Sequence, residues 1–283
     1  MKQKRVSLVL GSGGARGMAH IGVIKWLEEH NYKIVSISGC SMGALVGGFY
    51  AAGKLNVFTK WIEEVDGLDL IKLLDFSGTG GFVSGDKIVA KLEELFGDSL
   101  IEELDVKFTA VAADIGSEKE VWISEGSLLG AIRASTSLRL FFAPYIYNGK
   151  SLVDGGVLNP VPIAPTFDDN TDLTIAVNLG GKPQSQTVLG KIKKEMTLSS
   201  NITDYMSKIS LPESIVNEEG MYSVANKSFE TMQSTIARMK LSAYPPDVEI
   251  EIPRNLCGIF DFEMVDEVIK YGYDICKQTF ASK

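Results

Sequence analysis

The fold of this chain is decided at residues 34–48, which read IVSISGCSMGALVGG. The β-branched beginning of this stretch predicts a buried strand, and its apolar end predicts a helix. The junction spells G-x-S-x-G, a pattern that places a nucleophile on a sharp strand-to-helix turn. We expect Ser41 to adopt strained backbone angles there, and we expect Gly39 and Gly43 to leave room that a side chain would fill.

A serine at such a junction lies at a helix N-terminus, where the first-turn N–H groups carry partial positive charge. An anion that develops near the Ser41 hydroxyl oxygen would be stabilised by these groups. The same pattern also occurs as a simple packing turn, because small residues suit any tight strand-helix junction. The rest of the chain must distinguish between these two interpretations.

A second glycine-rich turn comes earlier in the chain. Residues 6–10 predict a buried strand, and residues 11–17, GSGGARG, connect it to a helix predicted over 18–30. Successive small residues let backbone N–H groups converge on one point, as a phosphate cradle or an oxyanion hole requires. A dinucleotide site would need glycine where Arg16 stands and an acidic residue after the second strand. We therefore favour the oxyanion hole.

Length and composition indicate a globular chain with an acidic balance. It has 283 residues, of which 45% are hydrophobic and 23% charged, and its net charge is -8. The length allows one large α/β domain or two small ones, and we expect a single domain over 1–283. The negative charge excludes nucleic acid as the main ligand and disfavours tight electrostatic docking on anionic lipid.

Cysteine and histidine usage indicates no metal centre and no other cofactor. The three cysteines, Cys40, Cys257 and Cys276, lack metal-ligand spacing, and two histidines are too few for a usual zinc site, so we expect reduced, structural thiols. The N-terminal apolar run is too short for a signal peptide, and no apolar run reaches about eighteen residues. We expect a cytoplasmic protein that contacts the inner face of the membrane transiently.

Strands and helices alternate through the rest of the chain. Strands are predicted at 106–115, 119–123, 173–179 and 248–252, and helices at 56–74, 86–96, 127–136, 219–241 and 262–280. This alternation predicts a mostly parallel sheet covered by helices on both faces. The polar composition of residues 180–220 predicts a mobile excursion with some helix.

A candidate base follows a predicted hairpin. Asn148 and Gly149 form a strong hairpin turn, and the strand after it delivers Asp154 into two glycines. We expect this carboxylate to face a cleft, although an aspartate before glycine also commonly stabilises its own turn. The aromatic run at 138–147 is either part of the core or the wall of an acyl-chain pocket.

The three motifs together resemble the patatin-like phospholipase family, especially its bacterial members. The resemblance rests on residues 11–17, 39–43 and 154–156, in that order, and weaker similarity extends through the C-terminal part of the chain. It implies a three-layer α/β/α sandwich of the patatin type. It also implies a catalytic serine-aspartate dyad in which Ser41 is the nucleophile and Asp154 is the base.

The same resemblance implies roles for further residues. The oxyanion hole is expected from Gly11, Gly13, Gly14 and Arg16, with the Arg16 side chain ordering the loop. Candidate acyl-pocket residues are Met42, Leu138, Phe141 and Phe142. This chain departs from the family at Arg139, which stands where proline is typical and which can alter the pocket and the choice of substrate.

A dyad also follows from the residues themselves, because a serine triad needs a histidine and this chain offers only His20 and His30. No pattern pairs His20 with Ser41, so we expect His20 at a solvated position or at the edge of the core. Asp154 would accept the Ser41 proton while Ser41 attacks an ester carbonyl, and water would hydrolyse the acyl-enzyme.

We therefore predict a lipid acyl hydrolase that acts on a phospholipid, a lysophospholipid or a simpler carboxylic ester. Two alternatives stay open on the sequence alone. The chain could be a scaffold or regulatory protein with little turnover on the same fold. It could also be an acyltransferase that passes the acyl group to an alcohol or thiol instead of water.

Overall fold

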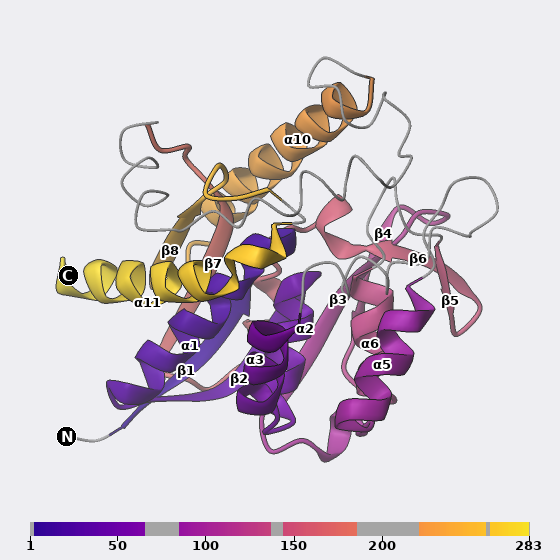
Figure 1. Ribbon diagram of the computed structural model, residues 1–283, viewed down its shortest axis with the longest axis horizontal. Helices are drawn as coiled ribbons and strands as arrows, with labels where there is room; N and C mark the ends of the chain where they lie inside the picture. The colour runs from indigo at the N-terminus through magenta and orange to yellow at the C-terminus, as the bar shows by residue number, and fades with distance from the viewer. Residues whose placement is uncertain (1–2, 66–84, 137–143, 186–220, 259–260, 283) are drawn as a thin grey trace.

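The structure is a computed structural model that describes residues 3–65, 85–136, 144–185, 221–258 and 261–282 (Figure 1). Within these ranges eight strands form one sheet in the order β5-β6-β3-β2-β1-β7-β8, and β4 also pairs with β3. The strands are β1 (Lys4–Leu10), β2 (Tyr32–Cys40), β3 (Lys107–Asp114), β4 (Lys119–Ile123), β5 (Tyr145–Tyr147), β6 (Lys150–Asp154), β7 (Leu173–Gly181) and β8 (Val248–Pro253).

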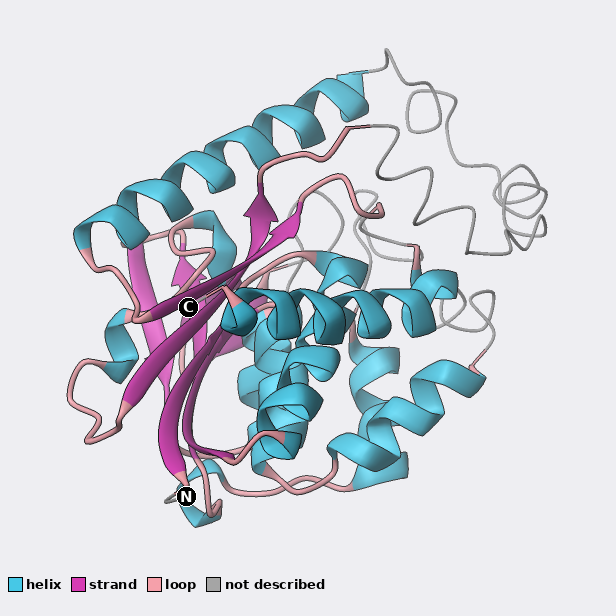
Figure 2. Cartoon of the chain, turned by 90° about the vertical axis from the view of Figure 1, so that its left-hand side faces the viewer, coloured by secondary structure: helices cyan, strands magenta, loops and turns pink. Residues whose placement is uncertain are grey.

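Helices lie on both faces of this sheet, and Figure 2 shows α10 on the opposite side from the group that contains α1 and α11. The helices are α1 (Ala19–Glu29), α2 (Met42–Ala51), α3 (Leu55–Glu64), α5 (Asp86–Phe96), α6 (Leu128–Ser135), α10 (Met221–Ala243) and α11 (Val265–Ala281). The predicted three-layer arrangement is confirmed. None of the helices in the described ranges is long and apolar enough to cross a membrane.

The centre of the sheet is parallel and one side of it is antiparallel. Strand β1 pairs in parallel with β2 and β7, β2 pairs in parallel with β3, and β7 with β8. Strands β4 and β6 run antiparallel to β3, and β5 runs antiparallel to β6. The last pair is the predicted hairpin, whose turn residues Asn148 and Gly149 both have positive φ, 47° and 75°.

The central strands bury side chains on both faces because successive residues point to opposite sides. Leu8 and Leu10 of β1 belong to the large core beneath α1, α2 and α11. Val9, between them, belongs to a second cluster, which α10 covers with Ala237 and Leu241. The apolar side chains of residues 6–10 therefore contribute to two separate cores.

Two glycines let α11 cross α1 at backbone contact. A Cβ atom added to Gly22 would lie 1.9 Å from the Ile269 carbonyl oxygen, and one added to Gly272 would lie 2.0 Å from the Ala19 carbonyl oxygen. The C-terminal helix therefore holds the first turn of α1, which directly follows the glycine-rich turn.

Several predicted segments extend beyond the described residues. Helix α3 confirms the first part of the helix predicted at 56–74, and its remainder lies outside the described ranges. The same is true of residues 137–143 in the aromatic run and of most of the excursion predicted at 180–220. Helix α10 confirms the helix predicted at 219–241 over the residues that are described, from Met221 onward.

Candidate active site

In the turn between β2 and α2, Ser41 has a strained backbone conformation, with φ 56° and ψ -124°. Such angles are rare for a residue with a side chain, and they cluster at functional sites. The flanking glycines are required by close packing. A Cβ atom on Gly43 would lie 2.1 Å from the Leu10 carbonyl oxygen, and one on Gly39 would lie 2.5 Å from the Gly43 carbonyl oxygen.

A serine outside the motif holds this turn in place. The Ser135 hydroxyl at the end of α6 accepts a hydrogen bond from the Ser41 N–H at 2.9 Å and donates one to the Val111 carbonyl oxygen at 2.6 Å. It thereby links the nucleophile turn to β3. A serine at the end of a predicted short helix is the only local signal for this role, and that pattern alone predicts no function.

Strand pairing brings Asp154 next to the same turn. Cys40 pairs with Val111 of β3, and the next residue of β3, Ala112, pairs with Asp154. The Cys40 thiol donates to Asp154 Oδ1 at 3.7 Å, and Ser41 directly follows Cys40. Ser41 is 3% exposed and Asp154 is 0% exposed. Ser41 and Asp154 thus lie at the ends of β2 and β6, on either side of β3, with little access to solvent.

The turn after β6 explains why Asp154 is buried. Its Oδ1 accepts a hydrogen bond from the Gly156 N–H at 2.8 Å, so the turn-stabilising interpretation is confirmed. A Cβ atom on Gly155 would lie 2.1 Å from the Val111 carbonyl oxygen, so the backbone directly after Asp154 packs on β3. Because Asp154 is 0% exposed, the expectation that it is exposed to a cleft is wrong.

The start of the glycine-rich turn is held by backbone hydrogen bonds. The Gly11 N–H donates to the Val177 carbonyl oxygen at 3.1 Å, and the Ser12 N–H donates to the Pro160 carbonyl oxygen at 2.8 Å. Because its N–H group is already committed to β7, Gly11 fixes the root of the turn and has no amide hydrogen left for a ligand.

The N–H groups of the next two glycines, Gly13 and Gly14, differ from those of Gly11 and Ser12. Among the described residues, neither the Gly13 N–H nor the Gly14 N–H has a hydrogen-bond acceptor. Gly14 has φ 57°, a conformation that favours glycine, and a Cβ atom on Gly13 would lie 2.5 Å from the Leu179 side chain. In the described part of the chain, neither of these two amide hydrogens is therefore used to hold the turn.

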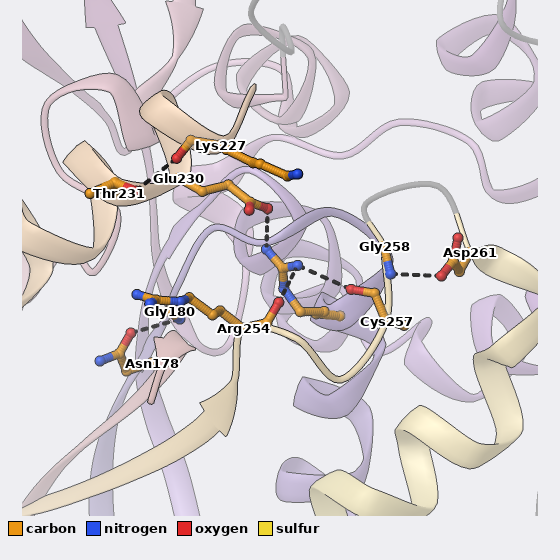
Figure 3. Close-up of polar contacts among 10 residues, drawn as sticks. Asn178, Gly180, Lys227, Glu230, Thr231, Arg254, Cys257, Gly258 and Asp261 are labelled. Carbon is orange, nitrogen blue, oxygen red and sulfur yellow. Dashed lines mark hydrogen bonds and ion pairs between the residues drawn. The ribbon is translucent and has the colours of Figure 1, made fainter. Parts of the chain in front are cut away.

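Arg16 anchors the turn to the C-terminal part of the chain. Its buried guanidinium donates to the carbonyl oxygens of Arg254 at 2.8 Å and Cys257 at 3.1 Å, and it forms an ion pair with Glu230 of α10 at 3.3 Å (Figure 3). The side chain is therefore used for ordering the turn, as the resemblance implies.

His20 supports the turn from inside the protein. Its Nε2 lies 2.9 Å from the Gly11 carbonyl oxygen, which can only accept, so Nε2 carries the hydrogen. Burial lowers the pKa of His20 to about 4, although the hydrogen bond to Gly11 raises it. The expectation of a solvated or edge position is wrong, because His20 is 0% exposed in the region where α11 crosses α1.

The candidate acyl-pocket residues are only partly described. The Met42 side chain packs on the glycine-rich turn, since a Cβ atom on Gly17 would lie 2.2 Å from Met42 Cγ. Leu138, Phe141 and Phe142 lie outside the described residues, as does Arg139. Within the described ranges no three side chains of histidine, cysteine, aspartate or glutamate are grouped closely enough to hold a metal ion, and the three cysteines are free of disulfides.

Comparison with known proteins gives a match over more than half of the chain. A family model described as patatin-like phospholipase matches residues 8–167, a range that contains all three motifs. The chain belongs to the patatin-like phospholipase family. The family predicted from the motifs is therefore confirmed.

Relatives of this patatin-like chain extend over nearly its whole length. An NTE family protein of Mycobacterium tuberculosis is 35% identical over 97% of this chain and 91% of that protein. The lysophospholipase NTE1 of Coccidioides immitis is 28% identical over 97% of this chain but only 17% of its own length. The crystal structure of VipD from Legionella pneumophila shares the fold, with a TM-score of 0.53, 15% identity, and coverage of 100% of this chain and 67% of that chain.

A small pocket lies beside the glycine-rich turn of this patatin-like chain, beneath α10. Its polar lining residues are Ser12, Arg16, Asn178, Glu230, Gln233, Ser234 and Arg254. Gln233 Nε2 also donates to the Gly156 carbonyl oxygen at 3.1 Å, next to the turn that holds Asp154. Helix α10 therefore borders both the glycine-rich turn and the aspartate turn.

Proposed function

We propose that this chain hydrolyses the carboxylic ester bonds of lipids through an acyl-enzyme intermediate on Ser41. The observation that carries the proposal is the position of a strained serine at a helix start, one residue from a thiol that contacts Asp154. The backbone strain is costly, on the order of 1–3 kcal/mol, and a packing turn would not require it.

The first half of the reaction forms the acyl-enzyme. Ser41 Oγ attacks the ester carbonyl carbon while the Asp154 carboxylate takes the hydroxyl proton. The N–H groups of Gly13 and Gly14 stabilise the negative charge on the carbonyl oxygen, and the α2 N-terminus adds its partial positive charge. The C–O bond then breaks, and the departing alcohol takes the proton from Asp154.

The second half releases the fatty acid. Asp154 takes a proton from a water molecule, which attacks the acyl carbon, and Ser41 Oγ leaves with that proton. The proposed mechanism gives His20 no role in either step, and its Nε2–H group holds the Gly11 carbonyl oxygen.

Lysophospholipids are the substrate class that we propose. The support is the lysophospholipase NTE1 relative, which aligns with nearly the whole of this chain. A lysophospholipid has one acyl chain, so a single acyl-chain pocket is sufficient to hold it.

The test is the release of fatty acid from lysophosphatidylcholine by the wild type, Ser41→Ala and Asp154→Asn. We expect each variant to lose at least about a thousandfold in kcat, because each removes a group that acts in bond formation. Thermal unfolding and circular dichroism establish that the compared proteins are folded.

Two matched variants make this test specific. Ser38→Ala makes the same change three residues earlier in β2, and Asp114→Asn makes the same change at the end of β3. Both controls should keep activity within about tenfold of the wild type. Full activity of folded Ser41→Ala or Asp154→Asn would contradict the proposed dyad.

A further inference from the structure

Helix α10 exposes an apolar stripe to solvent. Val224 is 57% exposed, Met232 is 54% exposed and Met239 is 68% exposed. At 3.6 residues per turn these three positions fall within about 80° of one another around the helix axis. They lie opposite Ala237 and Leu241, which pack on the sheet. The helix is therefore apolar on its inner side and carries a second apolar stripe on its outer side.

The charges of α10 are divided between the same two sides. Lys227 and Arg238 are exposed and lie within about 60° of Val224 around the axis, so they border the apolar stripe. Among the described residues neither cation has a carboxylate partner, and Arg238 donates to the hydroxyl of Thr235. The single acidic residue of the helix, Glu230, is turned inward to Arg16.

We call the outer face of α10 the surface formed by Val224, Lys227, Met232, Arg238 and Met239. Around the helix axis the exposed residues Ser228, Thr231 and Thr235 lie between these side chains. This face combines flexible apolar side chains with long cations and lacks carboxylates. Amphipathic helices that lie in the interfacial layer of a membrane have this composition.

A tryptophan extends the surface beside the helix. Trp122 of β4 is 49% exposed, and its ring N–H donates to Glu120 at 3.2 Å. Glu120 also holds Lys240 of α10 in an ion pair, so β4 and α10 are in direct contact here. Tryptophan is favoured where apolar and aqueous surroundings meet, because its ring is apolar and its N–H group is polar.

The outer face of α10 is positively charged although the whole chain has a net charge of -8. At physiological ionic strength charges further than about 8 Å from the surface are largely screened. The local charge of the docking face then decides the interaction, and here it is positive.

The inner side of α10 connects this face to the site. Glu230 pairs with Arg16 of the glycine-rich turn at 3.3 Å, and Gln233, one turn later, donates to the Gly156 carbonyl oxygen. A lipid surface bound to the outer face would therefore lie close to both halves of the site.

We propose that the outer face of α10, with Trp122 beside it, docks on a lipid surface that carries anionic headgroups. The inference rests on the proposed function in one respect, namely that the docked lipid supplies the substrate of Ser41. The binding step itself does not depend on turnover and is measured separately.

The experiment is co-sedimentation of Ser41→Ala protein with large vesicles of phosphatidylcholine, alone or with about one third phosphatidylglycerol. We expect binding that increases with the phosphatidylglycerol content. Lys227→Glu combined with Arg238→Glu should weaken binding to the anionic vesicles about 30-fold, since each cation near such a surface contributes about fivefold. Met232→Ser combined with Met239→Ser should weaken it about tenfold, because less apolar surface is buried.

Matched variants on other surfaces make the result specific to α10. Lys25→Glu with Lys277→Glu makes the same charge change on α1 and α11, and Val57→Ser with Ile146→Ser removes two exposed apolar side chains on α3 and β5. Both pairs should leave vesicle binding within about twofold of the parent. Only variants whose thermal unfolding midpoint equals that of the parent protein are compared.

The possible outcomes separate docking from catalysis. Absence of binding to anionic vesicles, or equal losses in the α10 variants and their controls, would overturn the docking proposal. Hydrolysis of a short, monomeric ester by the protein with Ser41 intact tests the dyad independently. Vesicle binding without any ester hydrolysis would leave the docking proposal standing and contradict the proposed function.

Discussion

On one face of the sheet α1, α2 and α11 cover a continuous core that includes Leu8, Ile24 and Phe49. On the other face α10 covers a cluster of six described side chains, to which it contributes Ala237 and Leu241. The catalytic candidates Ser41 and Asp154 lie at the ends of β2 and β6, between the two helical layers. Residues of the first face position the nucleophile turn and the glycine-rich turn, whereas α10 closes over them from the second face.

This difference shows that the two turns of the candidate site are supported by a large core, while the helix that borders them, α10, packs on a smaller one. Stability within a protein follows the local amount of buried apolar contact. The large core supports the turns that carry Ser41 and Gly11, whereas among the described residues α10 contributes only Ala237 and Leu241 to a core cluster. Four predictions test this comparison.

The largest expected effect lies in the large core. Phe49→Ala removes a side chain that is 1% exposed and stacks on Phe58 at a ring distance of 4.7 Å. It should lower the free energy of unfolding by about 4 kcal/mol, through lost burial and the cavity left behind. Urea unfolding measures this loss. A change below about 1 kcal/mol would contradict the assignment of this face as the main core.

Acidification tests the part of the large core beneath the glycine-rich turn. The pKa of His20 is about 4 in the folded protein, whereas an unperturbed histidine in the unfolded chain has its ordinary pKa of 6.5. The unfolded chain therefore binds the proton first as pH falls. The stabilisation is complete above pH 6.5 and is lost down to about pH 4, by about 3 kcal/mol in total.

His20→Gln keeps a donor for the Gly11 carbonyl oxygen and removes the titration. Unfolding free energies measured between pH 7 and pH 4 should therefore decrease less in this variant than in the wild type. His30→Gln makes the same substitution at an exposed histidine at the end of α1 and is measured in parallel as the reference. Identical pH slopes for all three proteins would show that His20 does not contribute.

The α10 face should respond more weakly to the same kind of truncation. Leu241→Ala in the small cluster should cost about 2 kcal/mol, near the lower limit for buried leucine, because few side chains surround it. Leu95→Ala on α5, where the side chain is 40% exposed, is the control and should cost less than about 1 kcal/mol. If urea unfolding gave equal losses of unfolding free energy for Leu241→Ala and Phe49→Ala, the proposed difference between the two faces would be contradicted.

The smallest effect is expected at the contact between α10 and the glycine-rich turn. Glu230→Gln removes one charge from the ion pair with Arg16, whose guanidinium keeps both carbonyl acceptors. Because Glu230 is partly exposed, the free energy of unfolding should fall by only about 1 kcal/mol. Thermal unfolding detects this change, and a loss similar to that of Phe49→Ala would show that α10 is as firmly held as the opposite face.

The sequence allowed prediction of those features that depend on neighbouring residues. The elbow at Gly39–Gly43, the hairpin at Asn148 and the alternation that builds a parallel sheet are local patterns, and each follows from glycine freedom or side-chain periodicity. Long-range contacts were not predictable. Arg16 meets the carbonyl oxygens of Arg254 and Cys257, which are 238 and 241 residues away.

Burial also depends on the assembled fold. The sequence placed Asp154 in a cleft and His20 at an edge, and both are 0% exposed because elements distant in sequence cover them. The role of Ser135 required knowing that α6 ends beside the nucleophile turn. The net charge of the chain likewise did not predict that the cations of α10 face outward while Glu230 faces inward.

The measurement that tests the central claim most directly is the intact mass of the protein after treatment with a fluorophosphonate, which reacts with activated serine hydroxyls. Wild-type protein should gain one adduct, located on Ser41 by peptide mapping. Folded Ser41→Ala should gain none, and Asp154→Asn should react at least about a hundredfold more slowly because its serine lacks a base. No adduct on the folded wild type, or equal labelling of Asp154→Asn, would contradict the account.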